Sequence, residues 1–327
     1  DEWLAAVARW RKQLAGLRTK DDGKTYPDAN SEYLFLQTVV GVWPRASAEG
    51  GVPDAKGLES LAERVHAYML KASKEGKTMT SWTEPNEAFE KALDAYVKGA
   101  LSAKSREFLS DLDRFVGGIA RAGYWNALGR VMLHFTTPGT PDLYQGDELW
   151  AFALVDPDNR RPVDWEQRER VLAEVERAAT PEARRALLAE AVRAPEDGRV
   201  KLLLTRALLH ARRDNPALFR EGSYRELEVT GTHAERVVAF VREHGDARAL
   251  VVAPRLTLGL GRDGAPPVGA RWGDTRLRVP SAIVRAEWRS ALTGDRLAAG
   301  NGSDEGLSLG TLLADAPVGC WIAGGAA

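Results

Sequence analysis

Apolar residues recur at helical spacing over most of the first 215 positions of the chain. Between residues 3 and 17, large apolar side chains follow one another at alternating steps of four and three. This spacing places them on one face of a helix. Similar spacing predicts the later helices, and Asn86 and Thr180 stand where helix caps are expected. These helices are expected over residues 32–43, 58–72, 87–96 and 105–123, from residues 165 and 181, and over residues 200–213.

A short apolar run at residues 131–135 interrupts the helical pattern. It ends abruptly in a segment rich in proline, glycine and threonine at residues 136–141. This pattern is typical of a buried strand that delivers its chain into a loop at a sheet edge. We therefore expect a strand at residues 131–135, followed by a long loop.

From Tyr224 onward the apolar period changes to about two. Residues 237–241 and 249–252 have the composition of strands, and a turn is indicated at Thr293-Gly294-Asp295. Short strands separated by frequent turns are typical of a small antiparallel sandwich. The chain is therefore expected to be α+β overall, with a domain boundary near Asn215 and Pro216.

Composition and charge narrow the class of protein. The 327 residues are 44% hydrophobic and 28% charged, and 45 basic and 46 acidic residues leave a net charge of -1. Nothing in this balance suggests a surface for nucleic acid or for a membrane, and no apolar run is long enough to span a bilayer. A single cysteine, Cys320, excludes an internal disulfide framework and favours a reducing, cytoplasmic location. The five histidines show no metal-ligand spacing, so neither a metal nor a cofactor is expected.

The loop that follows residue 135 carries the chemistry. It contains carboxylates, amides, aromatic residues and two adjacent arginines, Arg160 and Arg161. Charged groups form strong hydrogen bonds to hydroxyls, and flat aromatic faces accept the apolar faces of sugar rings. A polyhydroxylated ligand is therefore expected in this region.

The sequence of this loop resembles that of the α-amylase family. Residues 139–148 read GTPDLYQGDE and match the family's Gly-x-Pro-x-x-Tyr-x-Gly-x-Glu segment, which follows the last strand of a TIM-type barrel. Residues 156–160 match its Asp-Pro-x-x-Arg element. The resemblance implies that Asp156 and Arg160 bind donor-side glucose. It also implies that Gly139, Pro141 and Glu148 have structural roles at the site.

Three longer segments resemble the maltooligosyltrehalose synthases more narrowly. They read PDANSEY at residues 27–33, KASKEGKTMTSWTEPN at residues 71–86 and LVDPDNRRPVD at residues 154–164. Enzymes of this family convert the reducing-end α-1,4 bond of a maltooligosaccharide into an α,α-1,1 bond. The resemblance implies a maltooligosaccharide substrate, with Asn159, Arg161, Tyr144, Trp82 and Trp150 as further binding residues.

One motif of that family is absent from the chain. The resemblance implies three catalytic carboxylates, one of them in a Thr-His-Asp-Thr-Lys-Arg type motif after the seventh barrel strand, and no such motif occurs here. The chain also begins at Asp1 rather than at methionine. We interpret it as a C-terminal fragment without catalytic residues, inactive alone and normally completed by an N-terminal barrel part. The expected divisions are a helical insert at residues 1–123, the last barrel strand, its loop and helices at 124–215, and the sandwich at 216–327.

Each candidate residue also has a plainer interpretation. Asp142, Asp147 and Glu148 could supply the two carboxyls of glycosidic chemistry, but loop-shaping roles are favoured because the resemblance assigns catalysis elsewhere. Asp156 and Arg160 could form a solvated ion pair that closes the loop, although sugar binding is preferred. Trp82 and Trp150 border loops and could either stack on glucose or pack internally.

Two other functions and one structural consequence remain open. The chain could belong to an ordinary α-amylase-type hydrolase or transglycosylase, or it could be a non-catalytic glucan-binding module. A strand taken from a parallel barrel would lack its neighbours, and an unpaired strand is a template for association. Self-association through residues 132–135, or cover by a helix, is therefore expected.

Overall fold

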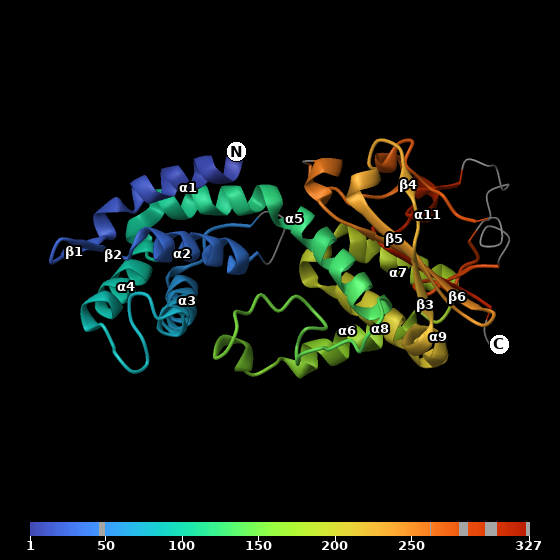
Figure 1. Cartoon of the computed structure of the whole chain (residues 1–327), viewed down its shortest axis with the longest axis horizontal. Coiled ribbons are helices and arrows are strands. Elements are labelled where there is room, and N and C mark those ends of the chain that lie inside the picture. Colours follow the sequence, from blue (N-terminus) through green and yellow to red (C-terminus); the bar gives the residue numbers. More distant parts are fainter. Residues whose placement is uncertain (46–49, 262, 281–286, 298–305, 325–327) are drawn as a thin grey trace. The chain divides into compact units, whose positions relative to one another are not determined.

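Helices make up most of the N-terminal half of the chain. The computed structural model describes residues 1–45, 50–261, 263–280, 287–297 and 306–324. The chain forms two units, Asp1–Gly117 with Phe152–Pro162, called unit 1, and Gly118–Ala151 with Val163–Ala327, called unit 2. Figure 1 shows the elements of both, coloured along the sequence.

Unit 1 is a helical bundle with one small hairpin. Its helices are α1 (Glu2–Gln13), α2 (Ala29–Val42), α3 (Ala55–Gly76), α4 (Glu87–Ala100) and the first part of α5 (Arg106–Thr136), and its hairpin pairs β1 (Thr19–Asp21) with β2 (Lys24–Tyr26). The side chain of Asn86 accepts a hydrogen bond from the N–H of Phe89 at 3.1 Å, so the predicted cap of α4 is confirmed. The expected helices in this part of the chain are likewise confirmed.

A buried carboxylate lies among the aromatic residues of this bundle. Glu32 on α2 is 1% exposed and accepts hydrogen bonds from Arg11 at 2.6 Å, Arg18 at 2.8 Å and the Tyr96 hydroxyl at 3.0 Å. Burial and the adjacent Glu32 carboxylate raise the pKa of Tyr96. A buried charge is tolerated only when it is paired in this way, so Glu32 ties α1 and the following turn to α2 and α4.

The expected strand at residues 131–135 is wrong, because these residues are helical. Helix α5 continues without a break from Arg106 to Thr136. Tyr124, Leu128, Met132 and Phe135 recur at steps of three and four and are all buried in one cluster. The run has four apolar residues and His134, and so short a run is compatible with a strand and with a buried helix alike. Among the described residues there is consequently no unpaired strand at this position, and the self-association expected from it loses its basis.

Four helices of unit 2 follow the loop. They are α6 (Trp165–Arg177), α7 (Pro181–Arg193), α8 (Arg199–Asp214) and α9 (Pro216–Glu221). The side chain of Thr180 accepts a hydrogen bond from the N–H of Ala183 at 3.2 Å, and Pro181 occupies the first turn of α7. The predicted starts of α6 and α7 and the extent of α8 are confirmed.

Short 3-10 turns connect elements in both units. In chain order, η1 to η7 are Ala15–Leu17, Ala103–Ser105, Asp158–Arg160, Pro195–Asp197, Ala234–Arg236, Thr257–Leu260 and Gly269–Trp272.

The C-terminal strands form two antiparallel sheets. The larger has the order β3 (Ser223–Glu226), β5 (Val237–His244), β6 (Ala247–Pro254), β10 (Gly319–Ala323) and β8 (Arg289–Ser290). The smaller has the order β4 (Val229–Thr230), β7 (Arg276–Leu277) and β9 (Leu307–Ser308), with α11 (Leu309–Leu312) directly after it. The predicted switch from helical to strand periodicity near residue 224 is confirmed.

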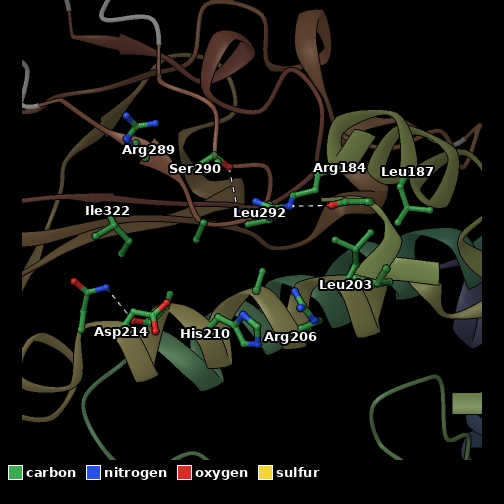
Figure 2. A pocket seen from close by; sticks show the side chains of 17 residues that line it. Arg184, Leu187, Leu203, Arg206, His210, Asp214, Arg289, Ser290, Leu292 and Ile322 are labelled. Atoms are coloured by element: carbon green, nitrogen blue, oxygen red, sulfur yellow. Dashed lines mark hydrogen bonds between the residues drawn. The ribbon is translucent and has the colours of Figure 1, made fainter. Parts of the chain in front are cut away.

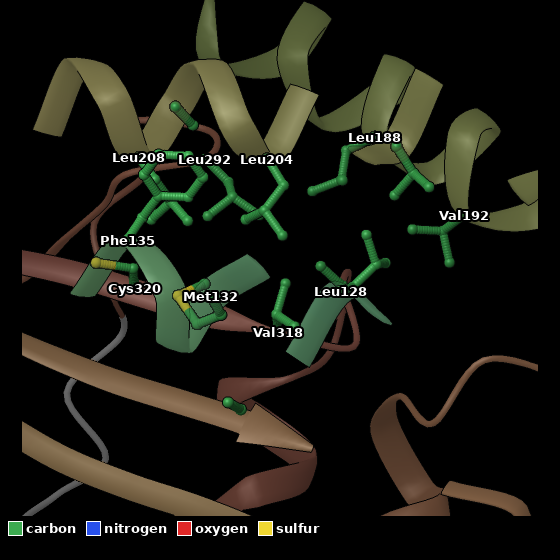
Figure 3. Packing of buried hydrophobic residues seen from close by; sticks show 14 of the residues in the cluster. Leu128, Met132, Phe135, Leu188, Val192, Leu204, Leu208, Leu292, Val318 and Cys320 are labelled. Atoms are coloured by element: carbon green, nitrogen blue, oxygen red, sulfur yellow. The ribbon is translucent and has the colours of Figure 1, made fainter. Parts of the chain in front are cut away.

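The larger sheet has a separate apolar cluster on each face, as alternation along its strands requires. Phe240, Val251 and Cys320 are cross-strand neighbours and belong to the cluster formed with α5, α7 and α8, part of which is shown in Figure 3. Their sequence neighbours on the same strands belong to the second cluster, with Trp272 and Leu309. Burial raises the pKa of the Cys320 thiol to about 12, so this residue packs as a small apolar side chain rather than as a reactive thiolate.

The chain is thus a helical region followed by small antiparallel sheets. No helix within the described residues is long and apolar enough to cross a membrane. The same part of the chain contains no group of three or more potential metal ligands. The barrel origin of residues 124–215 and the three-part domain division stay predictions.

Candidate functional site

Asp156 lies on a loop of unit 1 and contacts helix α3. Its carboxylate Oδ2 lies 2.7 Å from the ammonium of Lys71 and 3.2 Å from a guanidinium nitrogen of Arg160. The same ammonium donates to the main-chain carbonyl of Asp156 at 3.1 Å. The hydrogen bond from Lys71 is the main reason that the pKa of Asp156 lies below its usual value. The carboxylate is therefore ionised at neutral pH and anchored, yet its side chain is 40% exposed.

A second aspartate, Asp158, holds this loop together. It is 6% exposed and accepts hydrogen bonds from Arg64 at 2.9 and 3.0 Å and from the N–H of Leu154 at 2.8 Å. Burial alone would raise the pKa of Asp158, but these hydrogen bonds outweigh it and the pKa is lowered. Arg161 adds an ion pair at 2.9 Å. A bidentate arginine–carboxylate pair is geometrically specific, so Arg64 fixes the loop that carries Asp156.

Two further candidates in unit 1 have unfilled capacity for a ligand. The side-chain oxygen of Asn159 is buried and has no hydrogen-bond partner within the described residues. The Trp82 side chain is 62% exposed, and the ammonium of Lys74 lies 5.0 Å from its ring centroid. An aromatic face that remains this exposed is a suitable surface for stacking on a sugar ring.

The other candidates lie on the loop that follows α5 in unit 2. Gly139 has φ of +124°, a backbone conformation that a side chain would strain. The N–H of Asp142, next to Pro141, donates to His134 at 3.0 Å. Glu148 accepts from Arg168 at 3.2 Å, and the same guanidinium also donates to the carbonyl of Gly146. Through these contacts Glu148 helps Arg168 to stabilise the loop.

A cavity of about 540 Å³ opens beside this loop. Tyr144, Asp147, Lys201 and Thr205 are among the residues that line it. Burial lowers the pKa of Lys201, although its ammonium is 2.7 Å from Asp147. The Thr205 hydroxyl is buried and has no hydrogen-bond partner within the described residues. An unpartnered buried hydroxyl costs free energy, and it lies at the wall of this cavity.

Trp150 is more enclosed than the other aromatic candidates. Its ring stacks on Tyr124 with centroids 5.0 Å apart, and its indole N–H donates to the carbonyl of Pro195 at 2.6 Å. The ammonium of Lys201 lies 5.6 Å from the ring centroid. This ring therefore already has neighbours that would compete with a sugar.

The predicted residues fall into two groups. Asp156, Asn159, Arg160, Arg161 and Trp82 lie in unit 1, and Gly139, Pro141, Tyr144, Glu148 and Trp150 lie in unit 2. Asp156 and Arg160 line none of the cavities described here.

Sequence reasoning missed several residues that shape both groups. The sequence does not indicate Lys71, Arg64, Lys201 or Thr205 as part of a candidate site. The only sequence signal for Lys71 is its place in the KASKEGKTMTSWTEPN segment; its partner on the loop lies 85 positions away.

Comparisons with known proteins place these observations in context. Two curated proteins of Mycobacterium tuberculosis strains, each described as "putative maltooligosyl trehalose synthase", are 34% identical to the chain over 268 residues. The match covers 82% of this chain but 29% of each relative, so the chain spans less than a third of their length. No protein-family model matches the chain.

Solved structures agree with the sequence matches. The structure of maltooligosyltrehalose synthase from Arthrobacter ramosus is similar with a TM-score of 0.65 at 32% identity, covering 97% of this chain and 35% of that one. A Sulfolobus tokodaii structure described as a hypothetical maltooligosyl trehalose synthase has a TM-score of 0.59 at 21% identity, with coverage of 98% and 35%. At that identity the second likeness concerns the fold alone.

Proposed function

We propose that the chain is the part of a maltooligosyltrehalose synthase that binds a maltooligosaccharide. The chain is homologous to such enzymes over about 35% of the length of the solved chains. The observation that carries this proposal is the 34% identity over 268 residues, together with the three motif segments. The reaction would be the intramolecular conversion of a reducing-end α-1,4 bond into an α,α-1,1 bond.

The loop geometry supports a binding role for Asp156 and Arg160. The carboxylate is held ionised by Lys71 while its side chain stays 40% exposed, and the guanidinium of Arg160 is 69% exposed. Exposed charged acceptors and donors form the stronger class of hydrogen bonds to neutral hydroxyls. In the same unit, Trp82 would add aromatic surface, and Asn159 and Arg161 would add polar contacts. Tyr144, which lines the cavity of unit 2, is proposed as a separate contact.

In the proposed reaction the catalytic carboxylates belong to polypeptide outside these 327 residues. An aspartate would displace the reducing-end glucose and form a covalent glycosyl intermediate, and the anomeric hydroxyl of that same glucose would then attack the intermediate. No water is consumed, so the pocket must exclude water from the intermediate. The 327 residues alone are accordingly proposed to be inactive.

The test compares variants within a polypeptide of the full family length that carries these residues. Asp156→Asn and Arg160→Gln are each expected to lower kcat/KM for maltopentaose about tenfold or more, the effect of losing one charge-assisted hydrogen bond. Arg170→Gln is the matched control, because Arg170 forms a similar exposed pair with Glu166, four positions away on α6. This control is expected to leave kcat/KM unchanged.

Two results would contradict the proposal. One is turnover of maltopentaose by the 327-residue chain alone. The other is the formation of glucose and shortened oligomers without a non-reducing product, which would instead indicate an α-amylase-type hydrolase. Equal losses in the control and in the two loop variants would remove the binding role of Asp156 and Arg160 while leaving the reaction assigned.

A further inference from the structure

A second cavity in unit 2 has a different chemical character. Its volume is about 380 Å³, and it lies between α8 on one side and the end of α6, the start of α7, β8 and β10 on the other (Figure 2). None of the candidate sugar-binding residues lines it. Any ligand of this cavity is therefore separate from the proposed oligosaccharide.

Basic side chains dominate the polar part of the lining. Arg206 and His210 stand one helical turn apart on α8, and Arg184 faces them from α7 (Figure 2). In the part of the chain that the structure describes, Arg206 forms one long ion pair, 3.9 Å, with Glu176. Within the described residues, His210 has no hydrogen-bond partner. Burial and the positive charge of Arg206 lower the pKa of His210.

Arg184 contributes a fixed donor. Its Nε and Nη2 atoms donate to the carbonyls of Ala178 and Ala179 at 3.1 and 3.0 Å, which anchors the guanidinium at the C-terminal end of α6. Nη1 donates no hydrogen bond within the described residues, so its N–H groups remain available to a ligand. The one carboxylate of the lining, Asp214, is already paired with Arg213 at 2.7 Å.

Much of the remaining lining is apolar, although it includes Ser290 and Arg289. Its apolar side chains face the same space as the basic groups (Figure 2). They are Leu187 of α7, Leu203 of α8, Leu292 in the turn after β8 and Ile322 of β10. The volume falls at the lower end of the range for small-molecule sites. The lining therefore suits a ligand with an anionic group and a small, weakly polar body.

We propose that this cavity binds a small phosphate monoester, with its phosphate held by Arg184, Arg206 and His210 and its organic part against the leucines and Ile322. Guanidinium groups recognise phosphate oxygens through parallel, charge-assisted hydrogen bonds. A neutral sugar leaves the positive charges unpaired, so the site discriminates against the substrate class of the proposed reaction. The inference does not depend on that reaction.

Calorimetry on the 327-residue chain in a phosphate-free buffer tests the proposal with three probes. Phenyl phosphate is expected to bind with an affinity about tenfold or more above that of inorganic phosphate, because only the ester fills the apolar part of the cavity. Phenol, which has the same ring without the anion, is expected not to bind. No binding of phenyl phosphate at millimolar concentration overturns the proposal, and equal binding of phenyl and inorganic phosphate overturns the assignment of an ester.

Variants and a spectroscopic signal locate the site. Arg206→Gln is expected to weaken binding of phenyl phosphate about tenfold or more, whereas Arg170→Gln, the same change outside the cavity, is expected to have no effect. Among the five histidines, only the imidazole NMR signals of His210, assigned with His210→Ala, should shift on addition of phenyl phosphate. An equal loss in both arginine variants, or a shift at another histidine alone, overturns the proposal.

Discussion

At the scale of single residues, a fully buried arginine connects three parts of unit 2. Arg242 on β5 is 0% exposed and donates to the carbonyls of Thr136, Phe219, Gly222 and Ser223 at 2.8 to 3.2 Å. Burial, with Arg212 nearby, lowers the pKa of this guanidinium. The four acceptors are the ends of α5 and α9 and the start of β3, so one side chain satisfies the orphan carbonyls of two helix ends.

Replacing this side chain with an apolar one should be costly. Arg242→Met keeps much of the volume but leaves four carbonyls without their donor, among them those of the buried residues Thr136 and Phe219, at about 1–3 kcal/mol for each fully buried one. A total loss of about 3 kcal/mol or more in the free energy of unfolding is expected in urea denaturation. Arg248→Met on the neighbouring strand removes only a partly exposed pair with Glu243 and should cost at most about 1 kcal/mol. Similar losses in both variants would contradict this account.

At the same scale, sequence motifs located the candidate residues but not their partners. Asp156 and Arg160 were identified from a short local pattern, and their ion pair four positions apart was one of the two interpretations considered. The bond from Lys71 depends on how α3 packs against the loop, and no local pattern records that packing. Asp158 was overlooked because a buried aspartate and an exposed one look alike in sequence.

At the scale of elements, α5 shows where periodicity succeeds and where it fails. The expected helix over residues 105–123 is present, but it continues to Thr136 through the run that was expected to be a strand. In residues 131–135 apolar character on nearly every side hides the helical period, and the following proline and glycine residues mark the end of either element. Caps such as Asn86 and Thr180 were predictable because their contacts are local.

Two glycines of α5 give opposite predictions for the same substitution. A Cβ at Gly118 would meet no atom within 4 Å, whereas a Cβ at Gly129 would collide with the main-chain carbonyl oxygen of Pro254. Gly118→Ala should raise the free energy of unfolding by about 0.5–1 kcal/mol, since alanine loses less backbone entropy in a helix. Gly129→Ala should lower it by about 1–3 kcal/mol through overpacking.

Thermal and urea denaturation of the two variants check this pair. The decisive result is that the two changes in the free energy of unfolding have opposite signs, because helix propensity alone would stabilise both variants. Stabilisation by Gly129→Ala would mean that the close approach of α5 to the end of β6 is wrong.

At the scale of the whole molecule, titrating groups set how stability depends on pH. Burial lowers the pKa of His66 and His210 below 6.5, so the unfolded chain binds protons more readily at these sites. Hydrogen bonds from arginines lower the pKa of Glu243 and offset burial at Asp158. Both kinds of shift make the unfolded state the better proton acceptor at acidic pH.

The free energy of unfolding should therefore fall on acidification in two stages. The first begins as the pH drops through 6.5, where unfolded histidines become protonated. The second begins near pH 4.5 and continues below, where unfolded carboxylates become protonated before the folded ones. Urea titrations at about pH 8, 5.5 and 3.5 in phosphate-free buffers measure both stages. Equal or higher stability at pH 5.5 than at pH 8 would contradict the histidine contribution.

The overall architecture was predictable only where it follows from local periodicity. The succession of helices and the switch to strands near Tyr224 were visible, because each is a change of period along the chain. The pairing of β10 with both β6 and β8, and the assignment of the 152–162 loop to unit 1, depend on contacts between distant segments. A barrel strand was also expected from the resemblance. That expectation is wrong, because the residues concerned are part of α5.

The unequal surroundings of the two oxygens of Asp156 have a consequence for affinity. Lys71 and Arg160 both contact Oδ2, and no side chain of another described residue donates a hydrogen bond to Oδ1. An incoming hydroxyl can occupy the open oxygen without displacing either cation. Because the Asp156 side chain is already held in place, ordering it adds little to the entropic cost of association. In the proposed site, the cations that hold the carboxylate and the hydroxyl that it would bind thus contact different oxygens.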